Sequence, residues 1–87
     1  MNSRTTRSFW KQFDASPTDV RDQARKAFRL WRDDTAHPSL HFKRVHADEP
    51  LYSVRVTRGY RALGLLEGDT VTWFWIGSHA DYERIIS

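Results

Sequence analysis

The sequence predicts an α+β fold in which an N-terminal helical hairpin packs on a three- to four-stranded antiparallel sheet and a short helix ends the chain. Hydrophobic side chains recur at helical spacing up to residue 33 and alternate with polar ones after residue 40. Short turn-forming sequences separate the alternating stretches, as in an antiparallel meander. A chain of 87 residues has room for a single core, so residues 1–87 are expected to form one domain.

Residues 17–33 carry the clearest helical signal. Ser16 is expected to cap this helix, Pro17 to occupy its first position, and Asp19 to face the positive end of the helix dipole. Its apolar side chains recur on one face: Val20, Ala24, Ala27, Phe28 and Trp31. Residues 4–14 show the same spacing over a shorter length, which predicts a preceding helix joined to the first by a tight turn.

The second half of the chain is predicted to be a sheet. Residues 51–57, 60–66 and 71–76 read as strands because apolar and polar residues alternate and glycine-containing turns separate them. Residues 40–46 can add a fourth strand, although nearby prolines leave its limits open. Residues 79–86 are expected to form the short terminal helix.

Composition excludes several classes of protein. The chain is 39% hydrophobic and 14% aromatic, enough for a packed core, and it has no cysteine for disulfides or thiolate metal sites. Residues 1–7 are polar, and no segment approaches the ~18–20 apolar residues of a membrane span. We therefore expect a cytoplasmic protein that uses no cofactor, because glycine-rich phosphate loops and paired-carboxylate motifs are also missing.

The charge of the chain favours an anionic partner without requiring one. The net charge is +3 and the isoelectric point is about 9.7, with arginine far outnumbering lysine. The planar arginine side chain offers two donors to a phosphate, which suits nucleic acid or an acidic protein. The alternative is that a charge of this size serves only solubility.

Two arginines are the first candidate site. Arg55 lies on the polar face of its predicted strand, and Arg61 follows a short turn into the next strand. Antiparallel pairing across that turn would bring the two side chains together, where they could stabilise the growing charge of a phosphate. The alternative is that both are solvated and pair with Glu67 or Asp81.

His79 is the second candidate, because it directly follows an apolar strand, where functional groups are often presented. An imidazole can give or take a proton near neutral pH, and Tyr82 would share its helical face. The alternative is a purely structural histidine. A metal site is not expected, since the other histidines lie in an irregular stretch without a helical pair of ligands.

Four segments of the sequence, in this order, resemble the RelE/ParE toxin superfamily. They are His37-Pro38-Ser39-Leu40 followed by Phe42-Lys43, then Tyr52-Ser53-Val54-Arg55-Val56, then Tyr60-Arg61-Ala62, and finally Ile76-Gly77-Ser78-His79-Ala80-Asp81-Tyr82. The resemblance covers residues 9–86. It implies the toxin of a bacterial type II toxin–antitoxin system, partnered by a cognate antitoxin, and in the RelE branch an endoribonuclease (mRNA interferase) that cuts mRNA on the ribosome without a metal.

The resemblance also implies roles for individual residues. Arg55 and Arg61 would hold and stabilise the phosphate, and Lys43 would support the same charge. His79 resembles the terminal histidine that some members use as general acid or base, and Tyr82 would stack on or orient a nucleotide.

The chain departs from the superfamily at its start. Members usually open with a strand before the helical hairpin, whereas residues 1–7 are short and polar, so this strand is expected to be missing or reduced. Two alternatives to the ribonuclease stay open. One is the activity of the ParE branch, which inhibits DNA gyrase, and the other is an inactive remnant that only binds protein.

Overall fold

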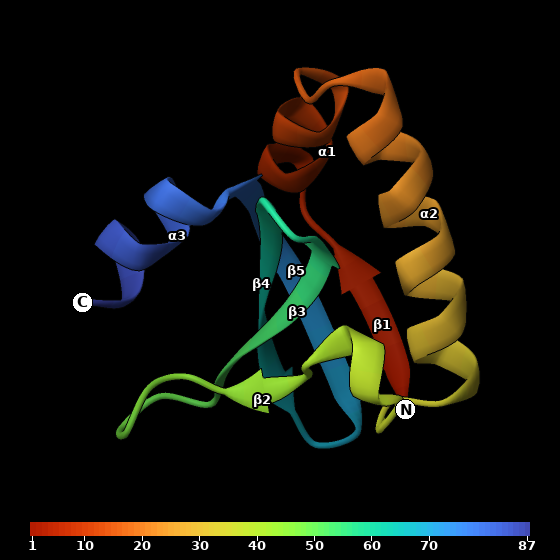
Figure 1. Ribbon diagram of the computed structural model, residues 1–87. Coiled ribbons are helices and arrows are strands. Elements are labelled where there is room, and N and C mark those ends of the chain that lie inside the picture. The colour runs from red at the N-terminus through yellow and green to blue at the C-terminus, as the bar shows by residue number, and fades with distance from the viewer.

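The computed structural model describes residues 1–87, which form two helices on one face of a five-stranded sheet and a third helix on the other side (Figure 1). The strand order is β1-β5-β4-β3-β2. The elements are β1 (Asn2–Thr5), α1 (Arg7–Asp14), α2 (Thr18–Asp33), the 3₁₀ helix η1 (Pro38–Leu40), β2 (Lys43–Arg44), β3 (Leu51–Thr57), β4 (Tyr60–Glu67), β5 (Thr70–Ser78) and α3 (His79–Ile86). The predicted α+β class, hairpin, meander and terminal helix are confirmed.

The N-terminal strand is present, contrary to the expectation that it would be missing or reduced. β1 pairs in parallel with β5, so the sheet is mixed rather than wholly antiparallel. The backbone N–H groups of Asn2 and Thr6 donate to Asp69 and Trp73, at 2.7 and 3.1 Å, and extend this pairing beyond both ends of the strand. Every residue of β1 is exposed, so its side chains show no apolar alternation from which a strand could be predicted.

The helical hairpin also begins differently from the prediction. α1 starts at Arg7 rather than at residue 4, because the Thr6 hydroxyl caps it by accepting from the Phe9 N–H at 3.2 Å. Ser16 was expected to cap α2, but its buried hydroxyl donates to the carbonyl of Gln12 at 2.9 Å, in the helix before. α2 has no side-chain cap.

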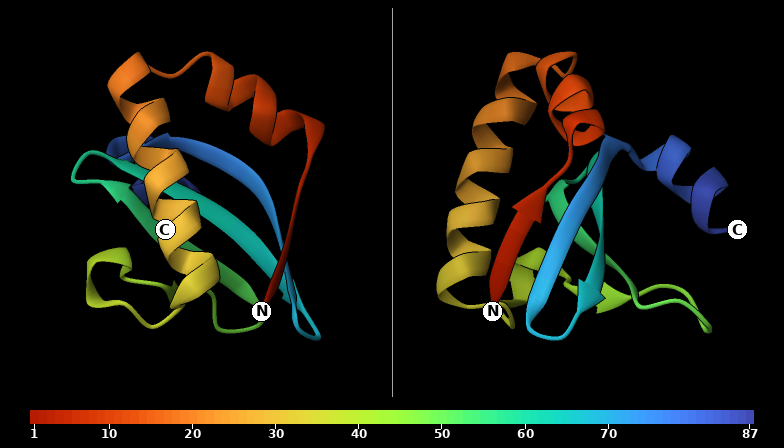
Figure 2. Two further views of the ribbon diagram at one scale, coloured as in Figure 1. Left: turned by 90° about the vertical axis from the view of Figure 1, so that its right-hand side faces the viewer. Right: turned by 180° about the vertical axis from the view of Figure 1, so that it is seen from behind.

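The core lies between the hairpin and the sheet. The left view of Figure 2 shows how these two layers face each other. Trp73 of β5 stands at its centre, with its ring centroid 5.1 Å from that of Phe28 and 5.4 Å from that of Trp31. Gly64 lies beside it in β4, and a Cβ there would be 2.5 Å from Val71 Cγ1 and 2.8 Å from Trp73 Cε3. The glycine therefore makes room for the large ring of the neighbouring strand.

β2 is shorter than the strand predicted at residues 40–46. Its two residues, Lys43 and Arg44, pair with Ser53 and Tyr52 of β3 at the end of the sheet opposite β1. The preceding residues form η1 because Pro38 favours a turn there. No helix of the structure is long and apolar enough to cross a membrane.

Candidate active site

A small cavity opens on the sheet face opposite the helical hairpin, where β2, β3 and β4 meet α3. Its volume is about 150 Å³. It is lined by His41, Lys43, Ser53, Arg61, His79, Tyr82, Glu83 and Ile86. Four of the five residues predicted from the sequence thus lie at one place, although they come from three separate elements of the chain.

The start of α3 fixes the position of His79. The Ser78 hydroxyl caps the helix by accepting from the Asp81 N–H at 3.2 Å. The backbone N–H of His79 donates to the carbonyl of Gly59 at 2.7 Å, which joins α3 to the turn between β3 and β4. Because neither contact involves the imidazole, the place of His79 does not depend on its own side chain.

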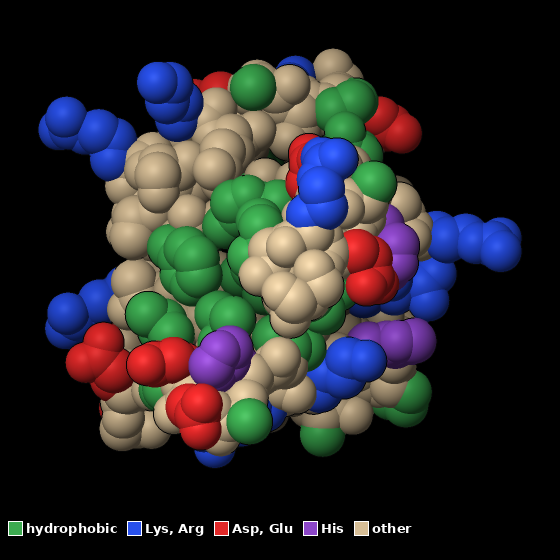
Figure 3. All heavy atoms as spheres, turned by 90° about the vertical axis from the view of Figure 1, so that its left-hand side faces the viewer, with side chains coloured by type: hydrophobic (Ala, Val, Ile, Leu, Met, Phe, Trp, Pro, Cys, Tyr) green, Lys and Arg blue, Asp and Glu red, His purple; other side chains and the backbone are tan.

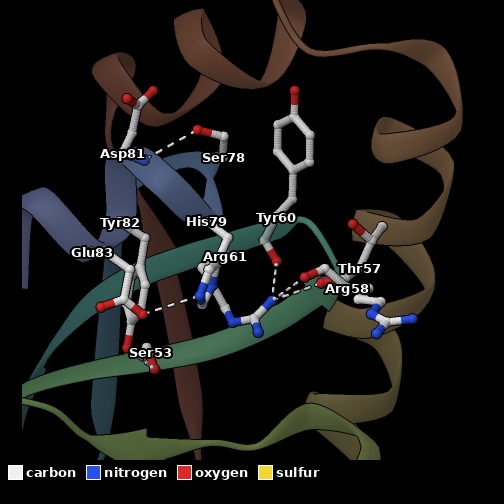
Figure 4. A network of polar contacts seen from close by, with 10 residues as sticks. All are labelled: Ser53, Thr57, Arg58, Tyr60, Arg61, Ser78, His79, Asp81, Tyr82 and Glu83. Atoms are coloured by element: carbon white, nitrogen blue, oxygen red, sulfur yellow. Dashed lines mark hydrogen bonds and ion pairs between the residues drawn. The ribbon is translucent and has the colours of Figure 1, made fainter.

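Tyr82 anchors α3 on the sheet. Its side chain is only 4% exposed, and its hydroxyl donates to the hydroxyl of Ser53 at 3.3 Å (Figure 4). Ser53 is polar but buried, because Tyr82 covers it. In this structure the ring of Tyr82 is therefore a core contact and is not open for stacking on a nucleotide.

The His79 side chain points toward Glu83, one helical turn further on (Figure 4). Its Nε2 lies 3.0 Å from Glu83 Oε1, and its Nδ1 is buried without a hydrogen-bond partner. The side chain as a whole stays 45% exposed, although its Nδ1 is enclosed. Sequence reasoning missed Glu83, although the spacing of four residues on a predicted helix was a usable signal.

Arg61 braces the turn between β3 and β4. Its Nη1 donates to the carbonyls of Thr57 at 2.7 Å, Tyr60 at 3.0 Å and Arg58 at 3.3 Å (Figure 4). Burial is the main cause that lowers the pKa of Arg61, and the neighbouring charge of Arg55 lowers it further, while Tyr82 and Glu83 act in the opposite direction. An arginine so shifted still carries its charge at neutral pH.

Arg55 lies directly opposite Arg61 in the register of β3 and β4, as the sequence predicted. Its side chain, however, lines a second cavity of about 220 Å³ between the sheet and α2, together with Lys26 and Ser39. The two guanidinium groups are therefore neighbours that line different cavities. Neither forms the predicted alternative ion pair with Glu67 or Asp81, because Asp81 pairs with Arg84.

Two further residues reach the cavity from the end of the sheet near β2. Lys43 extends from β2, as predicted, and His41 precedes it in a left-handed backbone conformation, with φ 46° and ψ 41°. Figure 3 shows this side of the molecule, where histidine, Lys and Arg side chains lie next to a hydrophobic patch. The cavity thus combines imidazoles and cations on an accessible face.

A model of the ParE-like toxin domain family matches residues 18–84, from α2 to near the end of α3. The chain belongs to this family. The resemblance of its sequence to the RelE/ParE superfamily is thereby confirmed. No curated protein matches the sequence of this chain at a significant level.

Solved structures of toxins share the fold of this ParE-like toxin domain at low sequence identity. The RelB-RelE antitoxin-toxin complex from Methanococcus jannaschii matches with a TM-score of 0.76 at 14% identity, over 97% of this chain and 99% of that one. YafQ from E. coli matches with 0.74 at 9% identity, over 93% and 96%. The YoeB/ParE toxin from Agrobacterium tumefaciens matches with 0.71 at 14% identity, over 91% and 99%.

Replacing Arg61 with lysine in the ParE-like toxin domain is expected to lower the free energy of unfolding by about 0.5–1.5 kcal/mol. Lysine keeps the charge but lacks the planar group that holds three carbonyls of the turn. Urea unfolding followed by circular dichroism measures the difference. Arg58→Lys is the matched control, because the Arg58 side chain is exposed in the same turn. Equal stabilities of the two variants would contradict the bracing role of Arg61.

Proposed function

We propose that this ParE-like toxin domain is the toxin of a toxin–antitoxin system and acts as an endoribonuclease that cuts mRNA on the ribosome without a metal ion. The observation that carries the proposal is the cavity in which His79 lies with Lys43 and Arg61. A proton-transfer group and two cations are among the elements that cleavage of a phosphodiester by its own 2′-hydroxyl requires.

In the proposed reaction, the 2′-hydroxyl of the RNA attacks the adjacent phosphate and the 5′ oxygen of the next nucleotide leaves. One group must remove a proton from the 2′-hydroxyl and another must protonate the leaving oxygen. His79 supplies one of these transfers, because its half-exposed imidazole can both donate and accept a proton. The reaction leaves a 2′,3′-cyclic phosphate on one RNA end and a 5′-hydroxyl on the other.

Lys43 and Arg61 stabilise the negative charge of the pentacoordinate phosphate. With one Nη atom held by the turn, Arg61 keeps its guanidinium in a fixed orientation and can present its remaining N–H groups to the phosphate. Arg55 lies beside it on β3 and is proposed to add to the positive potential near the phosphate rather than to bind the same oxygen atoms. Tyr82 is proposed to hold α3, and thus His79, in place.

The proposed partners are a cognate antitoxin and mRNA on the ribosome. Family membership supports the toxin assignment, and two similar folds were solved as antitoxin–toxin complexes, RelB-RelE of Methanococcus jannaschii and DinJ-YafQ of E. coli. The alternative of an inactive remnant that only binds protein rested on a reduced N-terminus. Because β1 is present and pairs with β5, this reason no longer applies. Inhibition of DNA gyrase remains the alternative, and the experiment described next distinguishes it from mRNA cleavage.

Mapping of mRNA 5′ ends after a brief induction of the toxin in a bacterial host tests the proposal. We expect new 5′-hydroxyl ends inside coding regions, which appear only in translated messages and increase before growth stops. Intact mRNA together with a DNA-damage response would instead favour gyrase inhibition and overturn the ribonuclease.

A further inference from the structure

The four histidines of the chain differ in what their rings do. In His37, Nδ1 accepts from the backbone N–H of Ser39 at 3.2 Å and so caps η1. In His46, Nδ1 accepts from the N–H groups of Asp48 and Glu49, at 3.1 and 2.9 Å, and so closes the loop before β3. These two rings hold backbone turns, which leaves His41 and His79.

The rings of both remaining histidines line the same cavity. His79 enters from the start of α3 and His41 from the segment between η1 and β2, which is about 40 residues away along the chain. The His41 side chain is exposed and makes no hydrogen bond within the chain, whereas Nε2 of His79 is paired with Glu83. The fold thus brings a free imidazole and a carboxylate-paired one to a single site.

The backbone of His41 supports a role for its side chain. It is the one non-glycine residue with a positive φ, at 46°. Its N–H donates to the carbonyl of Pro38 at 3.3 Å, which ends η1. Glycine adopts this conformation without strain, and a β-carbon makes it less favourable. The position therefore carries an imidazole at some cost to the backbone, and such costs are concentrated at functional sites.

We propose that His41 is the second acid–base residue of this site and accepts the proton of the 2′-hydroxyl, while His79 donates a proton to the leaving oxygen. The inference rests on the proposed ribonuclease activity. The roles follow from the contacts of each ring. Glu83 Oε1 lies 3.0 Å from Nε2 of His79 and can accept a hydrogen bond from a proton on that nitrogen. The His41 ring makes no hydrogen bond within the chain, so a ring nitrogen is open to accept the 2′ proton beside Lys43 and Arg61.

The proton balance of the reaction requires this pair of states. As the O2′–P bond forms, the neutral ring of His41 takes the 2′ proton. As the P–O5′ bond breaks, the protonated ring of His79 gives its proton to the departing 5′ oxygen. The RNA gains and loses one proton, the two rings exchange protonation states, and solvent restores them afterwards. The other titratable groups that line the cavity are Lys43, Arg61, Tyr82 and Glu83.

The first test compares His41→Asn with the matched control His46→Asn. Asparagine tolerates the left-handed conformation, so His41→Asn removes the imidazole and retains the turn. Single-turnover cleavage of mRNA on programmed ribosomes is expected to slow by at least about a hundredfold for His41→Asn. His46→Asn is expected to cleave at the wild-type rate, because its ring only closes a loop. A wild-type rate for folded His41→Asn would overturn the inference.

The second test separates base from acid with an mRNA in which sulfur replaces the bridging 5′ oxygen at the cleavage site. A thiolate leaves without being protonated, so this substrate needs a base but no acid. His79→Ala should recover cleavage on the sulfur substrate, and His41→Asn should remain slow. Recovery of His41→Asn to the same extent would overturn its assignment as the base. A purely structural defect would slow both substrates of both variants alike.

These outcomes distinguish the inference from the function on which it rests. If the wild-type chain cuts neither substrate under any condition that supports translation, the ribonuclease itself is wrong. If the wild type cuts and His41→Asn cuts equally well, only the role of His41 is wrong. Thermal unfolding of each variant, measured beside the kinetics, shows that the chains compared are folded.

Discussion

If the proposed ribonuclease activity holds, His79→Ala is expected to reduce mRNA cleavage by about 10²–10⁴-fold while the domain stays folded, because it removes the proposed proton-transfer group and little else. The imidazole is 45% exposed, and its ion pair with Glu83, itself 58% exposed, is of a kind that adds little to stability. The backbone N–H that ties α3 to Gly59 is present in alanine as well. Single-turnover cleavage on ribosomes, with thermal unfolding of the same preparation, measures both quantities.

Glu83→Gln is an informative companion to this variant. Glutamine keeps the length of the side chain and can still hydrogen-bond Nε2, but it loses the charge that pairs with a protonated ring. We expect a smaller loss of cleavage than in His79→Ala and the same melting temperature as the wild type.

Two outcomes would contradict the prediction for His79→Ala. If this variant unfolds the domain, or cuts mRNA as fast as the wild type, then His79 is a structural residue and the proposed site is wrong.

Trp73→Ala is expected to lower the free energy of unfolding by about 3–5 kcal/mol, a large part of the roughly 5–15 kcal/mol that holds a small domain together. The side chain is 1% exposed and packs edge-on against the rings of Phe28 and Trp31. Its removal leaves a cavity between the sheet and the hairpin that rigid aromatic neighbours cannot fill. Urea unfolding followed by circular dichroism measures the loss.

Two further variants test whether the burial of Trp73 causes the expected loss of stability. Trp10→Ala removes the same kind of side chain where it is 48% exposed, so a clearly smaller loss is expected. Trp73→Phe keeps most of the ring and removes an indole N–H that is buried without a partner, so it should also cost less than alanine. A loss below about 1 kcal/mol in Trp73→Ala would contradict the central place of this residue in the core.

The helices and the meander were predictable because their signals are local. The apolar stripe of residues 17–33 and the alternation in residues 51–57 follow directly from the periods of helix and strand. Two of the errors concern contacts that lie outside such local signals, one between segments distant in sequence and one at a helix cap. β1 is held by backbone hydrogen bonds to β5, more than 60 residues away, and its exposed side chains carry no pattern. Ser16 lies between α1 and α2 and could hydrogen-bond to either helix. Its hydroxyl donates to the carbonyl of Gln12 in α1.

The candidate site was predicted residue by residue but not as an arrangement. The sequence indicated Lys43, Arg61, His79 and Tyr82, and the structure brings all four to one cavity. It also shows that Tyr82 is buried and that the side chain of Arg55 lines a different cavity from that of Arg61. Side-chain direction depends on what covers each face of the sheet, and a strand pattern alone does not contain that information.

By itself the sequence determined the fold class, the order of the elements after β1 and the toxin family, because spacing, turn residues and short motifs are all local properties of the chain. Only the tertiary structure decided which histidines lie at the candidate site. His37 and His46 look no different from His41 in the sequence, but their rings cap backbone turns while that of His41 shares a cavity with His79. The physical reason is that a catalytic arrangement depends on distances across the fold, and those are set by how the sheet and α3 pack together.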